Sequence, residues 1–151
     1  MKTLLIVYHT GGVKTAQMAE AVERGARSEG SVNVVMKRCA DAGPEDVLAA
    51  AGLILGTPEN FGYMSGMMKD FLERVFYACE GKVNGRPWAL FVGAGQDGSG
   101  AVTSVERIVA GLRLEKKCEP VIGLKELTPE ILEQCEQLGA AFAAGLALGV
   151  F

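Results

Sequence analysis

The chain has 151 residues, 49% hydrophobic and 22% charged, so it is long enough to bury a core and too apolar for a disordered chain. Its 15 Lys and Arg against 18 Asp and Glu give a net charge of −3, which argues against a nucleic-acid partner. The four cysteines show no C-x-x-C pattern and the chain has one histidine, which argues against a zinc site built from Cys and His.

The first third of the chain alternates apolar strands with helices. Residues 3–8 form a run of apolar, branched side chains, which predicts a central parallel strand covered on both faces. After a Gly-bearing turn, apolar residues at helical spacing predict a helix that ends at Gly30. Residues 32–36 indicate a more exposed strand, and residues 44–50 indicate a short helix.

The same alternation continues along the middle of the chain. Residues 53–55 lie between two glycines and predict another buried strand, followed by apolar residues at helical spacing over 67–76. Residues 88–92 predict a fourth strand, and the apolar spacing over 102–112 predicts the next helix.

The sequence pattern for the last strand and helix is weaker than that for the earlier ones. Residues 118–122 indicate a fifth strand, and Pro120 places it at a sheet edge because proline cannot donate a ladder hydrogen bond. Thr128 followed by Pro129 is a favourable helix start, and the final helix is expected to run to about Leu148.

Five strands alternating with five helices predict an α/β fold, an open parallel sheet with helices on both faces. No linker or repeat interrupts it. A five-strand order 2-1-3-4-5 fits the length better than the six-strand dinucleotide-binding order. Ligands of such sheets bind beyond the carboxyl ends of the strands, so the loops after the first, third and fourth strands form the candidate site.

The first of these loops has the composition of an anion site. It places two threonines, two glycines and a lysine between a buried strand and a helix start. Backbone N–H groups and the helix dipole attract an anion there, and Thr10 and Thr15 can add hydroxyl donors. The loop matches neither the P-loop pattern nor G-x-G-x-x-G, which disfavours nucleoside triphosphates and dinucleotides. A turn that only caps the helix explains this loop equally well.

The second loop, residues 56–66, carries two aromatic residues and three glycines immediately after a buried strand. Phe61 and Tyr63 can line a flat, partly apolar ligand there, while Asn60 and backbone groups meet its polar edge. Met64 is a candidate for the mouth of a substrate site. The alternative is an ordinary turn whose aromatic side chains close the core.

The third loop, residues 93–98, matches G-x-G-x-x-G after a strand and before a helix. That pattern belongs to the first strand and helix of a dinucleotide fold, whereas here it follows the fourth strand. We therefore interpret the loop as a third wall of the same site. Gln96 and Asp97 can bond the polar groups of a ligand, and a helix-capping role explains Asp97 equally well.

Together the three loops resemble those of the flavodoxin-like FMN proteins, most closely the branch of NAD(P)H-dependent FMN reductases and tryptophan-repressor-binding-protein-like quinone reductases. The resemblance covers nearly the whole chain, and residues 56–66 are its most specific part. It implies a flavodoxin-like three-layer αβα sandwich around a five-stranded parallel sheet of order 2-1-3-4-5, with residues 1–151 as a single FMN-binding domain.

The resemblance also implies a role for each loop. The residues it assigns to the FMN phosphate are Thr10, Gly12, Val13, Lys14 and Thr15. Those that would border the isoalloxazine ring are Pro58, Glu59, Asn60, Phe61, Gly62 and Tyr63. Those that would complete its far edge are Ala94, Gly95, Gln96 and Asp97. FMN then carries the chemistry, and no catalytic side chain is required.

Two departures from the family pattern matter. The flavodoxin phosphate loop reads [ST]-x-T-G-N-T, whereas this chain has Gly12, Val13 and Lys14 in its last positions and therefore fewer side-chain donors. We expect the charge of Lys14 to compensate. The quinone-reductase branch carries a histidine in the third loop, whereas the single histidine here is His9, so quinone specificity does not follow from the resemblance.

The resemblance favours a two-electron oxidoreductase over other functions. Electron-carrying flavodoxins enclose the ring between aromatic residues and carry strong negative charge, whereas this third loop has no aromatic and the net charge is modest. We expect NADPH or NADH to reduce FMN, which then reduces a quinone, free flavin or another small acceptor. The alternative is a flavodoxin-type one-electron carrier. A signalling receiver is disfavoured because Thr57 stands where that class needs an acidic residue.

The remaining expectations concern the setting of the protein. The cysteines are interpreted as reduced core thiols, and the absence of an export signal before residue 9 favours a cytoplasmic protein. The longest uncharged run, residues 138–151, is shorter than the roughly 20 residues of a membrane span, so no span is expected. This apolar run, together with the resemblance to often oligomeric reductases, suggests a homo-oligomer, either a dimer or a tetramer.

Overall fold

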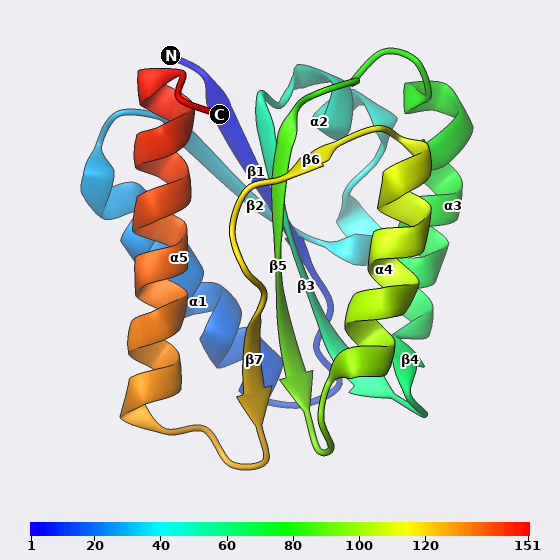
Figure 1. The fold of residues 1–151 in the computed structure, drawn as a ribbon, viewed down its shortest axis with the longest axis vertical. Coiled ribbons are helices and arrows are strands. Elements are labelled where there is room, and N and C mark those ends of the chain that lie inside the picture. Colours follow the sequence, from blue (N-terminus) through cyan, green and yellow to red (C-terminus); the bar gives the residue numbers. More distant parts are fainter.

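The computed structural model describes residues 1–151, which form a twisted sheet with helices packed on both faces (Figure 1). The strands of the main sheet are β1 (Thr3–Tyr8), β2 (Asn33–Arg38), β3 (Gly52–Asn60), β5 (Pro87–Ala94), β6 (Glu115–Lys116) and β7 (Val121–Leu124). A further short strand, β4 (Tyr63–Met64), pairs with the end of β3. The α-helices are α1 (Lys14–Glu29), α2 (Pro44–Ala49), α3 (Gly66–Cys79), α4 (Ser99–Gly111) and α5 (Pro129–Leu148).

Every strand pair of the main sheet is parallel. The order is β2-β1-β3-β5-β6, with β7 pairing with β5 as well. Parallel neighbours need crossover connections, and the helices of the chain supply them. The predicted order 2-1-3-4-5 is therefore confirmed, with β5 as the fourth strand and with β6 and β7 sharing the place of the fifth.

The predicted fifth strand over residues 118–122 is wrong at its start. The chain first pairs with the beginning of β5 at Glu115 and Lys116, then leaves the sheet, and returns as β7 at Val121. Pro120 lies in this break, outside both strands. Because proline has no N–H to donate, the ladder is interrupted before it and resumes after it.

The sheet buries a different apolar layer on each face. Leu4 and Ile6 of β1 pack with residues of α1 and α5, including the fully buried Phe142. Their neighbours Leu5 and Val7 pack with residues of α2, α3 and α4. Figure 1 shows α1 and α5 on one side of the sheet and the other helices on the opposite side. Burial on both faces explains why this strand is a continuous apolar run in the sequence.

Helices α1 and α5 approach each other closely through glycine. A Cβ at Gly25 would overlap the carbonyl oxygen of Glu136, and a Cβ at Gly139 would overlap that of Val22. The two contacts are reciprocal, one from each helix. A larger residue at either position would force the helices apart.

The helix ends agree with the predicted signals. Gly30 follows α1 in the left-handed conformation with φ 68°, as expected of a helix stop. The Thr128 side chain accepts a hydrogen bond from the N–H of Ile131 at 3.2 Å, with Pro129 at the first position of α5. That helix ends at Leu148, and none of the helices combines the length and hydrophobicity that a bilayer crossing requires.

Three of the four cysteines are core thiols, as predicted. Cys39, Cys79 and Cys135 are buried, whereas Cys118 is half-buried near the break before β7. Burial raises the pKa of the Cys39 and Cys135 thiols to about 12, so both stay protonated and unreactive at neutral pH.

Candidate functional site

The first loop, residues 9–13, connects β1 to α1 and is exposed at its tip. The first residue of the loop is fixed to β3, because the backbone N–H of His9 donates to the carbonyl oxygen of Gly56 at 3.0 Å. The Thr10 hydroxyl closes a tight turn by accepting from the N–H of Gly12 at 3.3 Å and donating to its carbonyl oxygen at 2.7 Å. Both glycines of the loop are exposed, and a Cβ at either would meet nothing within 4 Å. A ligand can therefore reach the backbone of this loop directly.

Among the α-helices, only α1 starts without a side-chain acceptor. Its N-cap residue is Val13, whose side chain cannot accept a hydrogen bond, and no acidic residue lies in its first turn. The acceptors at the starts of the other α-helices are Asp46 for α2, Ser65 for α3, Glu59 for α4 and Thr128 for α5. Free N–H groups at the positive end of the helix dipole make the start of α1 suited to an anion.

Two cations border the first loop. Lys14 donates from Nζ to the carbonyl oxygen of Ala94 at 2.7 Å, and burial lowers the pKa of its ammonium group. Arg38 holds its guanidinium carbon 5.3 Å from the centroid of the Tyr8 ring and donates from Nη2 to the carbonyl oxygen of Thr10 at 3.4 Å. Neither cation takes part in any ion pair of the structure. Their positive charges are therefore not neutralised by a carboxylate.

The second candidate segment, residues 56–66, is largely a β-hairpin rather than a loop. The strand predicted to end at Leu55 continues to Asn60, because the three residues after Leu55 stay paired with β5 and the next two pair with β4. The chain then turns at Phe61 and Gly62 and returns as β4, antiparallel to β3. The turn residues have φ angles of 55° and 68°, the signs required by a type I′ hairpin turn.

The hairpin tip presents its aromatic residues to solvent. Phe61 is fully exposed, and Tyr63 is 43% exposed. A left-handed φ is unfavourable for a side chain as bulky as that of Phe61. Met64 is buried instead, and its backbone N–H donates to Ser104 Oγ at 3.0 Å. The expectation that Met64 lies at a substrate mouth is therefore wrong, because this residue packs into the core beneath the hairpin.

Glu59 ties the hairpin to the third loop and to α4. One carboxylate oxygen accepts from the N–H of Gly98 at 3.2 Å, and the other accepts from Gly100 and Ala101 at 3.1 and 3.3 Å. The contact is close, since a Cβ at Gly100 would overlap the carbonyl oxygen of Gly62 at the hairpin turn. The Glu59 carboxylate therefore has its hydrogen bonds within the protein, where it is the acceptor for the start of α4.

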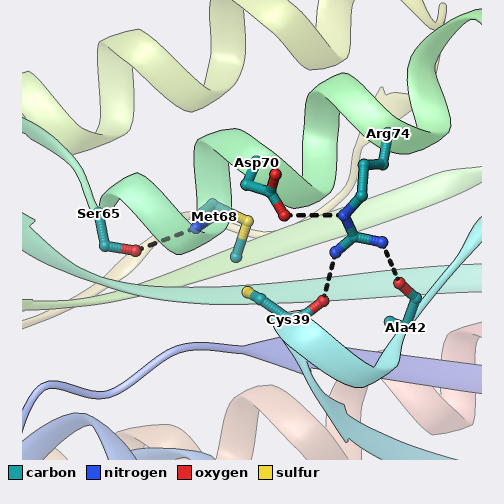
Figure 2. Close-up of polar contacts among 6 residues, drawn as sticks. All are labelled: Cys39, Ala42, Ser65, Met68, Asp70 and Arg74. Carbon is teal, nitrogen blue, oxygen red and sulfur yellow. Dashed lines mark hydrogen bonds and ion pairs between the residues drawn. The ribbon is translucent and has the colours of Figure 1, made fainter.

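A buried hydroxyl fixes the base of the hairpin. Thr57 is fully buried, and its Oγ1 donates to the carbonyl oxygen of Pro58 at 2.8 Å and accepts from the N–H of Ser65 at 3.0 Å. Ser65 in turn accepts from the N–H of Met68 at 3.2 Å and caps α3, as Figure 2 shows. The two ends of the hairpin are therefore held together and held to α3.

The third loop follows β5 and is open to solvent. Ala94 is buried at the end of the strand, whereas Gly95, Gln96 and Asp97 are exposed. Asp97 accepts from the N–H of Ser99 at 2.9 Å and from its hydroxyl at 2.8 Å, and these hydrogen bonds lower the pKa of the Asp97 carboxyl. Its carboxylate thus supports the turn before α4, and the exposed part of the loop contains no aromatic side chain.

The structure brings the three predicted segments to one edge of the sheet and links each pair. The His9 N–H joins the first loop to β3, Lys14 joins it to β5, and Glu59 joins the hairpin to the third loop. Thr15 is buried against β5, where a Cβ on Gly93 would lie 2.6 Å from its hydroxyl oxygen. The predicted residues therefore surround one region, the lower edge of the sheet in Figure 1.

Sequence reasoning missed Arg38. The predicted strand order could have identified it, because the second strand lies beside the first. The last residue of the second strand must therefore border the first loop. In the register of the sheet, Arg38 is directly paired with Tyr8, the last residue of β1.

A parallel sheet of order 2-1-3-4-5 with a loop site at its carboxyl edge defines the flavodoxin-like class of α/β proteins. A solved flavodoxin from the domain Archaea superposes with a TM-score of 0.84 at 20% identity, covering 95% of this chain and 98% of that one. This likeness establishes the fold.

Sequence comparison identifies the family within this class. The family described as NADPH-dependent FMN reductase matches residues 40–115, half of the chain, and the chain belongs to that family. A flavodoxin of Aquifex aeolicus is 38% identical over 66% of this chain and 54% of its own length. An NAD(P)H dehydrogenase (quinone) of Acidithiobacillus ferrooxidans is 31% identical over 70% of this chain and 63% of its own. The chain thus spans less than two thirds of each of these relatives.

We predict that Glu59→Ala lowers the free energy of unfolding by about 1–2 kcal/mol, because α4 loses the acceptor at its start. Glu59→Gln keeps the shape but loses one acceptor oxygen, so its stability falls between those of Glu59→Ala and the wild type. Urea denaturation followed by circular dichroism measures both. Glu126→Gln removes the same charge from an exposed loop and is expected to change stability by less than about 0.5 kcal/mol. A Glu59→Ala protein as stable as the wild type would contradict the capping role.

Proposed function

We propose that residues 1–151 form a single FMN-binding domain with the FMN phosphate at the first loop. The start of α1 offers free N–H groups and no carboxylate, and exposed glycines allow a phosphate to approach the backbone. These features fit a phosphate monoester. The residues proposed to hold it are Thr10, Gly12, Val13, Lys14 and Thr15.

We assign the isoalloxazine ring to the hairpin tip and the third loop. The exposed aromatic residues of the hairpin offer a flat apolar surface, and the exposed third loop offers polar groups. The residues proposed to border the ring are Pro58, Glu59, Asn60, Phe61, Gly62 and Tyr63 on one side and Ala94, Gly95, Gln96 and Asp97 on the other. Within this set Glu59 acts by holding the hairpin to α4, since its carboxylate is bonded to three N–H groups.

The function that the site supports best is the NAD(P)H-dependent reduction of a small acceptor, such as a quinone or free flavin. The third loop carries this proposal, because its exposed residues 95–97 include no aromatic side chain to cover the ring. FMN held by these residues would supply the redox chemistry, a hydride taken from NADPH or NADH and two electrons passed to an acceptor that takes up two protons. The residues of the chain hold the phosphate, border the ring and leave one wall open to both substrates.

A flavodoxin-type one-electron carrier is the second candidate function. The 38% identity to the Aquifex aeolicus flavodoxin supports it. A carrier takes up its two electrons at separated potentials, whereas a two-electron reductase takes them up together. A potentiometric titration of the flavin-loaded protein distinguishes the two.

We also propose that the protein works in the cytoplasm, where its four free cysteines stay reduced, and that it assembles into a dimer or tetramer. The apolar end of the chain supports assembly, since Leu148 and Val150 are 76% and 71% exposed in the single chain. Light scattering is expected to give a multiple of the 15.9 kDa chain mass. A 15.9 kDa particle at every concentration would exclude the oligomer.

The reductase proposal predicts that NADPH or NADH bleaches the visible absorption band of the bound flavin. The test is anaerobic stopped-flow mixing of the FMN-loaded protein with each nucleotide. The rate is expected to rise with nucleotide concentration and to saturate, because hydride transfer follows binding. Addition of a quinone should then restore the band.

The control is free FMN at the same concentration, which neither nucleotide should bleach at a comparable rate. Loaded protein that neither nucleotide bleaches, and that takes up its electrons at two separated potentials, would reject the reductase and favour the carrier.

A further inference from the structure

Arg38 lies at the end of β2, next to the loop to which we assign the FMN phosphate. Its strand partner is Tyr8, the residue that leads into that loop. Its guanidinium packs on the Tyr8 ring and donates its single hydrogen bond to the carbonyl oxygen of Thr10. The other N–H donors of the group remain for a ligand, since a guanidinium carries five.

The chain around Arg38 is held in place from two directions. Parallel pairing with β1 fixes the strand before it. Immediately after it, Arg74 of α3 donates to the carbonyl oxygens of Cys39 at 2.7 Å and Ala42 at 2.8 Å and is itself held by Asp70 at 2.8 Å (Figure 2). The position of the Arg38 backbone is therefore set by the fold.

The charge of Arg38 acts on the loop. It forms no ion pair, and its side chain is exposed. Burial lowers the pKa of His9, and the positive charge of Arg38 lowers the same pKa further. The field that disfavours a cation at His9 would favour an anion at the same loop.

The first loop and the start of α1 do not by themselves supply enough positive charge for a phosphate. Val13 offers no hydroxyl, and one of the three N–H donors of the Lys14 ammonium is already bonded to the carbonyl oxygen of Ala94. The helix dipole supplies only about half of an elementary charge, whereas a phosphate monoester carries up to two.

We propose that Arg38 binds the 5′-phosphate of the flavin and makes the site selective for FMN over riboflavin, which lacks the phosphate. The proposal rests on the proposed FMN function. It assigns to β2 a part of the cofactor site that the three loops do not contain.

The test compares FMN and riboflavin binding in Arg38→Gln, Arg38→Lys and wild-type protein, each titrated as apoprotein. Arg38→Gln is expected to weaken FMN binding by about 10- to 100-fold, the range of a charge-assisted hydrogen bond, and to leave riboflavin binding within about twofold. The FMN affinity of Arg38→Lys should lie between those of Arg38→Gln and the wild type, because lysine keeps the charge without the planar guanidinium. Added salt should weaken FMN binding less in Arg38→Gln than in the wild type.

The matched control is Arg24→Gln, which removes the same charge from an exposed position on α1 where Arg24 pairs with Glu136 at 3.0 Å. It should bind both flavins like the wild type. An independent measurement is the pKa of His9 by NMR, which the single histidine makes direct to assign. Arg38→Gln should raise this pKa toward its ordinary value, and Arg24→Gln should not.

Two outcomes would overturn the role of Arg38 while leaving FMN binding intact. In the first, Arg38→Gln binds FMN as tightly as the wild type. In the second, it loses FMN and riboflavin affinity by equal factors, which would mean that Arg38 shapes the loop rather than binding phosphate. Wild-type protein that binds no FMN would instead reject the proposed function and, with it, this role.

Discussion

Parallel pairing of β1 with β3, and of β3 with β5, decides where this chain can bind a ligand. Parallel strands end at the same edge of a sheet, so three segments far apart in the sequence meet there. A hydrogen bond then links each pair of segments, from His9, Lys14 and Glu59. Without this pairing, the loops would be three unrelated turns.

Helix capping separates the structural polar groups at this edge from those left for a ligand. Ser65 and Glu59 satisfy the starts of α3 and α4, and both belong to the hairpin segment between the strands of the site. The start of α1 has no such acceptor, because a valine stands at its N-cap position. Together with the unpaired charges of Lys14 and Arg38, this gap concentrates positive potential in a chain whose net charge is −3.

The spacing of apolar residues, together with the Gly and Pro residues that end helices and strands, was sufficient to predict most of the fold. Residues 3–8 are continuously apolar because the strand is buried on both faces. Gly30 adopts a left-handed backbone conformation that few other residues adopt. The failures arose where pairing overrode local pattern. The third strand continued past its apolar run because β5 supplies partners for Gly56, Thr57 and Pro58, and the fifth strand was interrupted at Pro120.

The site was predictable at the level of loops and less so at the level of side chains. The sequence indicates which loops meet, since strand order decides that. It does not indicate that the Glu59 carboxylate faces α4, that Met64 points into the core, or that Arg38 lies over Tyr8. Each of these follows from tertiary packing between segments at least 30 residues apart or from the turn geometry at Phe61.

Titration of the apoprotein with FMN, followed by flavin absorbance and fluorescence, tests the central proposal most directly. Saturable binding of one FMN per chain at micromolar concentration or below is expected, which corresponds to at least about 8 kcal/mol of binding free energy. No saturable binding in that range would contradict the proposed cofactor site, because the uncapped start of α1 and its two cations would then not act as a flavin phosphate site.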